Sequence, residues 1–195
     1  SELLTEHIMV KSYIGLKRQF ANLPAEPKAY LGKLEALLEG AGQYDIALAY
    51  IFMKLEEGHH RALKCGLIRL LKCNSRKVDD ALQRQHFTRK SYQVVFKNII
   101  GAALPAQTIR LLESAESIRD QQIHGKQVSQ DNLRKGISDA LSYIKEMGEF
   151  VEARTDKNPI GDLRGLAGRT HLLDGPTSFW VLKGVGLYVK EEQTS

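Results

Sequence analysis

Apolar residues recur every three or four positions through most of this chain, which is the spacing of an amphipathic helix packed against a core. Turn-forming residues interrupt the pattern at intervals, as at Asn22-Leu23-Pro24 and Gly40-Ala41-Gly42. The spacing therefore predicts five helices within the first hundred residues: Leu3–Phe20, Glu26–Leu38, Tyr44–Cys73, Arg76–Gln85 and Thr88–Ile100.

Two further amphipathic segments follow. The first begins at Pro105 and ends near His124, where Gly125 provides a stop signal. Its apolar stripe contains Ile109, Leu112, Ala115, Ile118 and Ile123. The second begins at Ser129 and continues to about Arg154. A series of helices joined by short turns predicts an all-α, antiparallel helical bundle over residues 1–154.

The pattern changes after Arg154, where glycine and proline become frequent among aromatic and β-branched residues. Two short segments, Arg169–Leu173 and Ser178–Lys183, flank the turn-forming sequence Asp174-Gly175-Pro176. This arrangement predicts a small β-hairpin. Residues 155–195 are too few to fold alone, so we expect this Gly-rich C-terminal extension to pack on the bundle or on a partner chain.

Composition supports a single helical core. The chain has 195 residues, of which 43% are hydrophobic and 26% are charged, enough for one complete core with a small appendage. No run of about eighteen uncharged apolar residues is present, and the first residues include Glu2, Glu6 and His7 rather than a basic and then apolar leader. We therefore expect a cytoplasmic protein with no membrane partner.

Positive charge is concentrated in one region. The chain has a net charge of +5, but the segment from Lys54 to Lys97 contains eleven basic and four acidic residues, a net charge of +7. Such a segment can attract RNA, or it can be a solvated helix face, and the sequence leaves both interpretations open. The candidate RNA-binding residues are Arg61, Lys64, Arg84, Arg89 and Lys90.

Several potential ligand and anchor residues lie in the same region. Glu57 and His60 share a helical face, as in di-iron bundles, but a second such pair with further carboxylates is not evident. Cys65 and Cys73 fit no zinc spacing, which predicts reduced thiols. The sequence thus predicts no metal site and no cofactor. Phe87, in the polar turn after Arg84, can either stack on a base or anchor the turn in the core.

Arg119, Asp120 and His124 combine residue types that suit phosphodiester chemistry. Histidine can transfer a proton near neutral pH, and arginine can hold the charge that develops on a phosphate. Positions five apart lie about 140° from each other on a helix, so Arg119 and His124 do not share a face. The same residues also suit a capped helix end, because cations favour the last turn and glycine follows it.

The order of these elements resembles the HEPN superfamily of small helical bundles. The resemblance covers Pro105 to about Arg154: a helix ending in Ile-Arg-Asp-x-x-Ile-His-Gly, a short polar loop and a final amphipathic helix. It implies a homodimer in which two Arg-x4-6-His motifs face each other, and in many members a metal-independent endoribonuclease. The implied catalytic residues are Arg119 as a charge stabiliser, His124 as general base or acid, and Asp120, which orients His124 or pairs with Arg119.

Other members of this family have lost catalysis. The second hypothesis is therefore a catalytically inactive HEPN-like module that binds a partner protein or a nucleotide. Such a module would form half of a toxin–antitoxin pair, with an antitoxin or a nucleotidyltransferase as its partner. A third reading is a structural all-helical protein whose charge asymmetry reflects only its dimer contacts.

Overall fold

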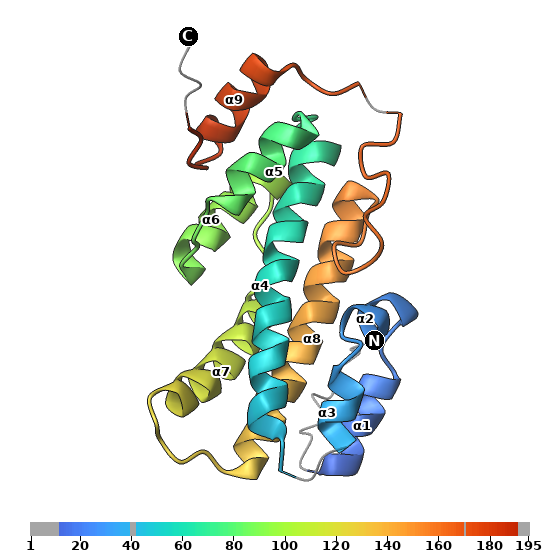
Figure 1. Ribbon diagram of the computed structural model, residues 1–195, viewed down its shortest axis with the longest axis vertical. Helices are drawn as coiled ribbons and strands as arrows, with labels where there is room; N and C mark the ends of the chain where they lie inside the picture. The colour runs from blue at the N-terminus through green and yellow to red at the C-terminus, as the bar shows by residue number, and fades with distance from the viewer. Residues whose placement is uncertain (1–11, 40–41, 170, 191–195) are drawn as a thin grey trace, which may run out of the picture. The chain divides into compact units, whose positions relative to one another are not determined.

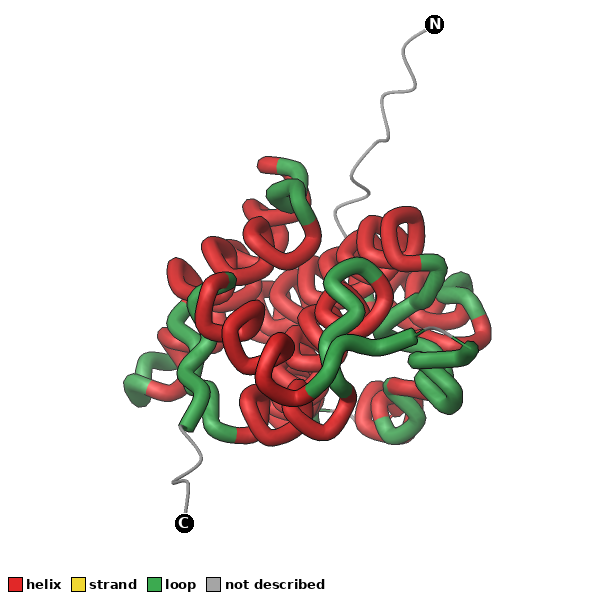
Figure 2. The backbone as a smooth tube through the Cα atoms, turned by 90° about the horizontal axis from the view of Figure 1, so that it is seen from above, coloured by secondary structure: helices red, strands yellow, loops and turns green. Residues whose placement is uncertain are grey.

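A computed structural model of the chain describes residues 12–39, 42–169 and 171–190, and these residues form helices joined by turns and loops (Figure 1). No strand occurs among them, as the colouring of Figure 2 shows. The described part contains nine helices: α1 Tyr13–Ala21, α2 Ala25–Tyr30, α3 Leu34–Glu39, α4 Tyr44–Arg69, α5 Ser75–Gln83, α6 Arg89–Ile100, α7 Ala106–Ile123, α8 Gln130–Thr155 and α9 Gly175–Gly184. The predicted all-α class is confirmed.

Side-chain caps set the start of several helices. Oxygen atoms of the Ser12, Asn74 and Thr88 side chains accept hydrogen bonds from backbone N–H groups in the first turns of α1, α5 and α6. The segment predicted as one helix over Glu26–Leu38 is instead two, α2 and α3, separated by a turn that contains Gly32, a poor helix former. The predicted helix over Leu3–Phe20 lies partly outside the described residues.

The predicted β-hairpin is wrong. Ser178–Lys183 belongs to helix α9, and the described residues of Arg169–Leu173 form no strand. The Asp174 carboxylate accepts a hydrogen bond from the Thr177 backbone N–H at 2.7 Å, so this aspartate caps a helix rather than turning a hairpin. Proline fits the first helical turn, where its missing N–H would have no helical partner.

The chain divides into two compact units, and α4 and α8 each contribute residues to both. Unit 1 comprises residues 1–54 and 107–145. Here α1 packs against α3, and α7 runs beside the first half of α4 (Figure 1). A Cβ atom on Gly136 of α8 would lie 3.3 Å from side-chain atoms of both Ile118 and Leu48, so three helices approach closely at this glycine. The division expected at residue 154 stays a prediction.

Unit 2 comprises residues 55–106 and 146–195. In this unit α9 packs on α5. Two hydrogen bonds join α9 and the residues just before it to the segment between α4 and α5. The Leu173 N–H donates to the Lys72 carbonyl at 2.7 Å, and the Asn74 N–H donates to the Ser178 hydroxyl at 2.8 Å. The C-terminal extension is therefore attached to the helices of its own unit.

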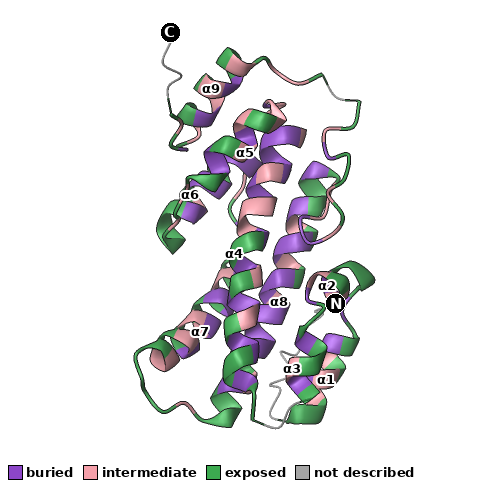
Figure 3. Cartoon of the chain, viewed as in Figure 1, coloured by how far each residue is buried: buried purple, intermediate pink, exposed green. Residues whose placement is uncertain are grey.

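Each unit has a buried apolar core, which Figure 3 shows as purple helix faces. The fully buried residues of unit 1 include Leu16, Leu31, Leu34, Leu48, Ile51, Ile137 and Tyr143. Those of unit 2 include Leu63, Leu67, Val78, Met147, Val151 and Leu182. Among the described residues, no helix combines the length and the apolar character required to cross a lipid bilayer.

Candidate catalytic site at the end of helix α7

Helix α7 ends in two backbone hydrogen bonds that fix the position of His124. The Gly125 N–H donates to the Gln122 carbonyl and the Lys126 N–H donates to the Gln121 carbonyl, both at 3.0 Å. Gly125 has a φ of +70°, in the left-handed region that favours glycine. This is the Schellman arrangement, and it makes His124 the C-cap residue of α7. The capped helix end that the sequence suggested is therefore present.

The Arg119 side chain is held on two sides. Its Nη2 and Nε atoms donate to the same oxygen of Asp120, at 2.9 and 3.2 Å. Its guanidinium carbon lies 4.4 Å from the centre of the buried Phe52 ring on α4, a cation–π contact. About a quarter of the side chain remains accessible, at 26%. Arg119 thus presents part of a positively charged plane at a fixed place on the surface of unit 1.

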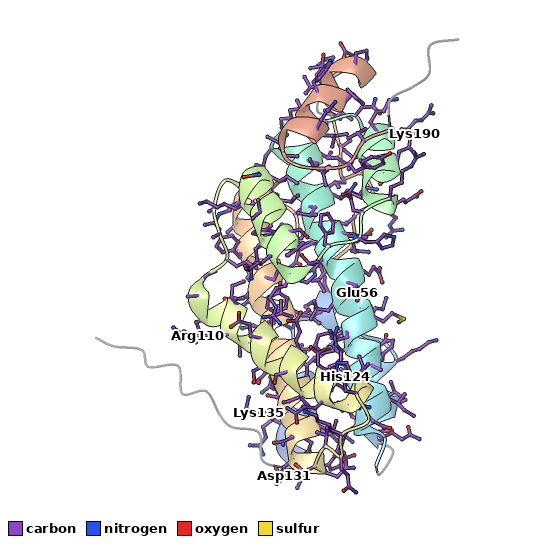
Figure 4. All side chains as sticks on the ribbon, turned by 90° about the vertical axis from the view of Figure 1, so that its left-hand side faces the viewer. Glu56, Arg110, His124, Asp131, Lys135 and Lys190 are labelled. Atoms are coloured by element: carbon purple, nitrogen blue, oxygen red, sulfur yellow. The ribbon has the colours of Figure 1, made fainter. Side chains whose placement is uncertain are left out.

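His124 is exposed and its imidazole has no hydrogen-bond or ion-pair partner within the described part of the chain. Figure 4 shows it at the C-terminal end of α7. The preceding residue, Ile123, is also exposed, at 68%. A histidine in this position can exchange protons with a molecule bound at the surface.

Within one chain, Arg119 and Asp120 form an ion pair, and His124 takes no part in it. Asp120 pairs with Arg119, and its side chain forms no hydrogen bond or ion pair with the His124 imidazole in the described residues. Only a backbone hydrogen bond joins the two positions, from the His124 N–H to the Asp120 carbonyl at 3.0 Å. A site that uses both Arg119 and His124 therefore requires either a substrate that spans them or a second copy of the chain.

The five candidate RNA-binding residues lie in unit 2, and they differ in how they are engaged. Arg61 donates to the backbone carbonyls of Pro159 and Gly161, which ties the segment after α8 to α4. Lys64 pairs with Asp79 of α5 at 2.5 Å. These two cations have structural roles within the unit.

The other three candidates, Arg84, Arg89 and Lys90, are exposed around the turn between α5 and α6. Phe87 of the same turn is partly buried, with its ring edge-on to His60 at 5.7 Å and to Tyr92 at 6.1 Å between centroids. Phe87 thus anchors the turn, while the three cations face solvent.

The histidine pair on α4 belongs to an aromatic cluster. The His59 ring stacks on Tyr92 with centroids 4.0 Å apart, and burial, with a smaller effect of His60, lowers the pKa of His59 to about 3. Burial also lowers the pKa of His60; the nearby Glu56 opposes this shift and His86 adds to it. Among the described residues, no group of three or more histidine, cysteine or acidic side chains is placed to hold a metal ion.

Phe52 is the one participant at this site that the sequence pattern did not identify. Phe52 is a buried residue of α4. Its contact with Arg119 depends on how α7 packs against α4, and no spacing within either helix carries that information. The pairing of Arg119 with Asp120, in contrast, is a contact between neighbours in the sequence.

Comparisons of the chain with models of known protein families, with curated proteins and with solved structures found no match. The resemblance to the HEPN superfamily therefore rests on the motif Arg119-Asp120-x-x-x-His124 and on the helix that follows it.

Proposed function

We propose that this protein is a metal-independent endoribonuclease of the HEPN type, active as a homodimer in the cytoplasm, where it would serve as a toxin or a defence component. The observation that carries this proposal is the end of α7, where a fixed, partly exposed Arg119 and an exposed His124 share one helix. The first can hold charge on a phosphate and the second can transfer protons, and neither role requires a metal ion.

The reaction uses the ribose 2'-hydroxyl of the RNA as the nucleophile. His124 of one copy removes the proton from this hydroxyl, and the oxygen attacks the adjacent phosphorus. Arg119 stabilises the negative charge on the non-bridging oxygens of the phosphorane. The protonated His124 then gives this proton to the 5'-oxygen as its bond to phosphorus breaks. The products are a 2',3'-cyclic phosphate and a free 5'-hydroxyl.

A second candidate function is favoured by a different observation. Ile123 is 68% exposed beside His124, and Asp120 already offsets the charge of Arg119. A single exposed apolar residue is common on protein surfaces, so Ile123 supports this candidate only together with the offset charge of Arg119. On this reading the chain is an inactive HEPN-like module that binds an antitoxin, a nucleotidyltransferase or a nucleotide.

RNA cleavage in the presence of EDTA separates the two candidates. We expect the wild-type protein to cleave single-stranded RNA without a divalent ion and to leave 2',3'-cyclic ends. His124→Ala and Arg119→Ala should each lower the rate by about 100-fold or more, since each removes a group that acts on the reacting phosphate. Product ends can be identified by mass spectrometry.

Two matched variants control for general effects of the substitutions. Arg110→Ala removes an exposed arginine from the same helix, and His171→Ala removes an exposed histidine from unit 2 (Arg110 and His124 are labelled in Figure 4). Both should retain wild-type cleavage. Equal activity of the wild-type and His124→Ala proteins, with both folded, would rule out the nuclease and favour the binding module.

A further inference from the structure

The last described segment of the chain, residues 175–190, exposes two large aromatic side chains. Trp180 on α9 is 66% accessible and Tyr188 beyond it is 65% accessible. The helix is held to its unit by other residues, since Ser178 and Leu182 are its buried positions. Large aromatic residues on a surface that contribute little to the core commonly mark a binding surface.

A lysine side chain, Lys183, lies close to the Trp180 ring. The Lys183 ammonium is 5.4 Å from the centre of the Trp180 ring and 5.7 Å from that of Phe179. The Phe179 ring stands almost perpendicular to Trp180, at 85° and 5.3 Å between centroids. The segment 175–190 contains no acidic residue. Trp180 is therefore a large ring supported by a second ring and a cation.

The backbone of the second aromatic residue, Tyr188, is hydrogen-bonded to the turn between α5 and α6 that carries exposed cations. The Gln85 side chain donates to the Tyr188 carbonyl at 2.8 Å, and Asn98 of α6 donates to the Val185 carbonyl at 3.1 Å. The first bond holds the chain at Tyr188 against the turn that exposes Arg84, Arg89 and Lys90, and the second holds Val185 against α6. Lys190, labelled in Figure 4, follows two residues later.

We propose that residues 175–190 bind single-stranded RNA, with bases stacked on Trp180 and Tyr188 and phosphates bound by Lys183, Arg84, Arg89 and Lys90. This inference rests on the proposed function, because it assigns a recognition surface for the same substrate class. Exposed aromatic rings bind unpaired bases, whose faces are free, whereas the bases of a duplex are stacked on each other. The neighbouring cations match the negative backbone of RNA and make its binding salt-dependent.

Trp180 is the only tryptophan in the chain, so its fluorescence reports directly on this surface. The experiment titrates the wild-type protein with a single-stranded oligonucleotide whose 2'-hydroxyl groups are all methylated. Such RNA cannot be cleaved by attack of its 2'-oxygen. We expect saturable quenching of Trp180, weaker at higher salt, and little quenching by a duplex of the same sequence.

Variants test the two rings separately by fluorescence anisotropy of a labelled, methylated oligonucleotide. Trp180→Ala and Tyr188→Ala should each weaken binding by roughly fivefold to a hundredfold, the usual effect of losing one stacked base. Trp180→Phe should retain most of the affinity, because it keeps an aromatic face. Tyr13→Ala, which removes an exposed tyrosine from α1 in unit 1, is the matched control and should bind as the wild type does.

Three results would overturn the inference: binding of the oligonucleotide with unchanged Trp180 fluorescence, equal quenching by duplex, or a shift of Trp180 fluorescence with protein concentration alone. The last would mean that another copy of the chain covers this surface. The outcome is separable from that of the proposed function. Cleavage without quenching would contradict only the proposed stacking surface. Quenching without cleavage would contradict only the proposed nuclease activity.

Discussion

At the scale of single residues, the central question is how Arg119 can serve a substrate while it is paired with Asp120. The pair is accessible to solvent, with side-chain exposures of 26% and 52%. Ion pairs of this kind contribute only about 0–1 kcal/mol to stability. A phosphate that forms two charge-assisted hydrogen bonds with the guanidinium can therefore replace Asp120. In the absence of a phosphate, the contacts with Asp120 and Phe52 hold Arg119 in place.

The pKa of His59 leads to a prediction about stability. Burial lowers this pKa to about 3 in the folded protein, against the ordinary value of 6.5 that the unfolded chain retains. Above pH 6.5 both states are neutral and the shift has no effect on stability. As the pH falls below 6.5, only the unfolded state takes up this proton, so stability is lost. At pH 5 we expect a loss of about 2 kcal/mol from this residue alone.

Urea denaturation of the wild type and His59→Phe at pH 7 and pH 5 measures this effect. Phenylalanine keeps a ring against Tyr92 but cannot be protonated, so the variant should lose less stability between the two pH values. Both proteins contain the same acidic groups, so the comparison between them isolates His59. His171→Phe, at an exposed position, should retain the full wild-type pH dependence. Identical pH dependence of His59→Phe and the wild type would contradict the assignment.

The residue-level chemistry of the candidate site was predictable where partners are neighbours in the sequence. The pairing of Asp120 with Arg119 and the glycine cap after His124 involve residues within six positions of each other. The support of Arg119 by Phe52 was not predictable, because it joins residues on two helices far apart in the chain. Sequence spacing reports on local geometry, whereas the orientation of a side chain on a neighbouring helix depends on tertiary packing.

At the scale of elements, the long helices were predictable because their apolar period persists for many turns. The segment that became α9 was not. The six-residue segment Ser178–Lys183 contains an apolar run of only four residues, which suits a strand or a helix equally well by period. Two features favour the helix. The Thr177 N–H donates a capping hydrogen bond to Asp174, and α9 contacts α5. Short elements therefore depend on their caps and on their tertiary partners.

Gly66 gives a prediction at this scale, because helix propensity and packing oppose each other. Propensity alone would make Gly66→Ala stabilising by about 1 kcal/mol. However, a Cβ atom at this position would lie 2.5 Å from Ile99 Cγ2 and 2.7 Å from Ile100 Cδ1. Both isoleucines are buried and their β-branched side chains rotate poorly, so α6 must move. We expect a net loss of about 1–2 kcal/mol in the free energy of unfolding.

Chemical denaturation of Gly66→Ala provides the measurement, and Gly184→Ala provides the control. Gly184 is the last residue of α9, and no atom lies within 4 Å of the place where its Cβ would be. The control should change stability by less than about 0.5 kcal/mol. A more stable Gly66→Ala protein would show that α4 and α6 pack less closely than the structure describes.

At the scale of the whole molecule, each compact unit combines segments far apart in the sequence. Unit 1 joins residues 1–54 with 107–145, and unit 2 joins 55–106 with 146–195. The all-α class follows from the apolar period. The period of one helix, however, does not say which distant helix will pack against its apolar face. The candidate site also concerns the whole molecule. Within one chain His124 is not part of the Arg119–Asp120 pair, so the question is whether a second copy of the chain completes the site.

Mixing two inactive variants tests whether two copies share a site. If each site takes Arg119 from one chain and His124 from the other, a dimer of Arg119→Ala with His124→Ala retains one complete site of two. Random exchange makes half of the dimers mixed, so an equal mixture should recover about a quarter of wild-type cleavage. If both residues act within one chain, every site in the mixture is defective and no activity returns.

His124→Ala mixed with the double variant Arg119→Ala/His124→Ala is the matched control, because it forms dimers without restoring any site. Recovery no greater than in this control, with exchange of subunits verified by labelled chains, would place the site within one copy.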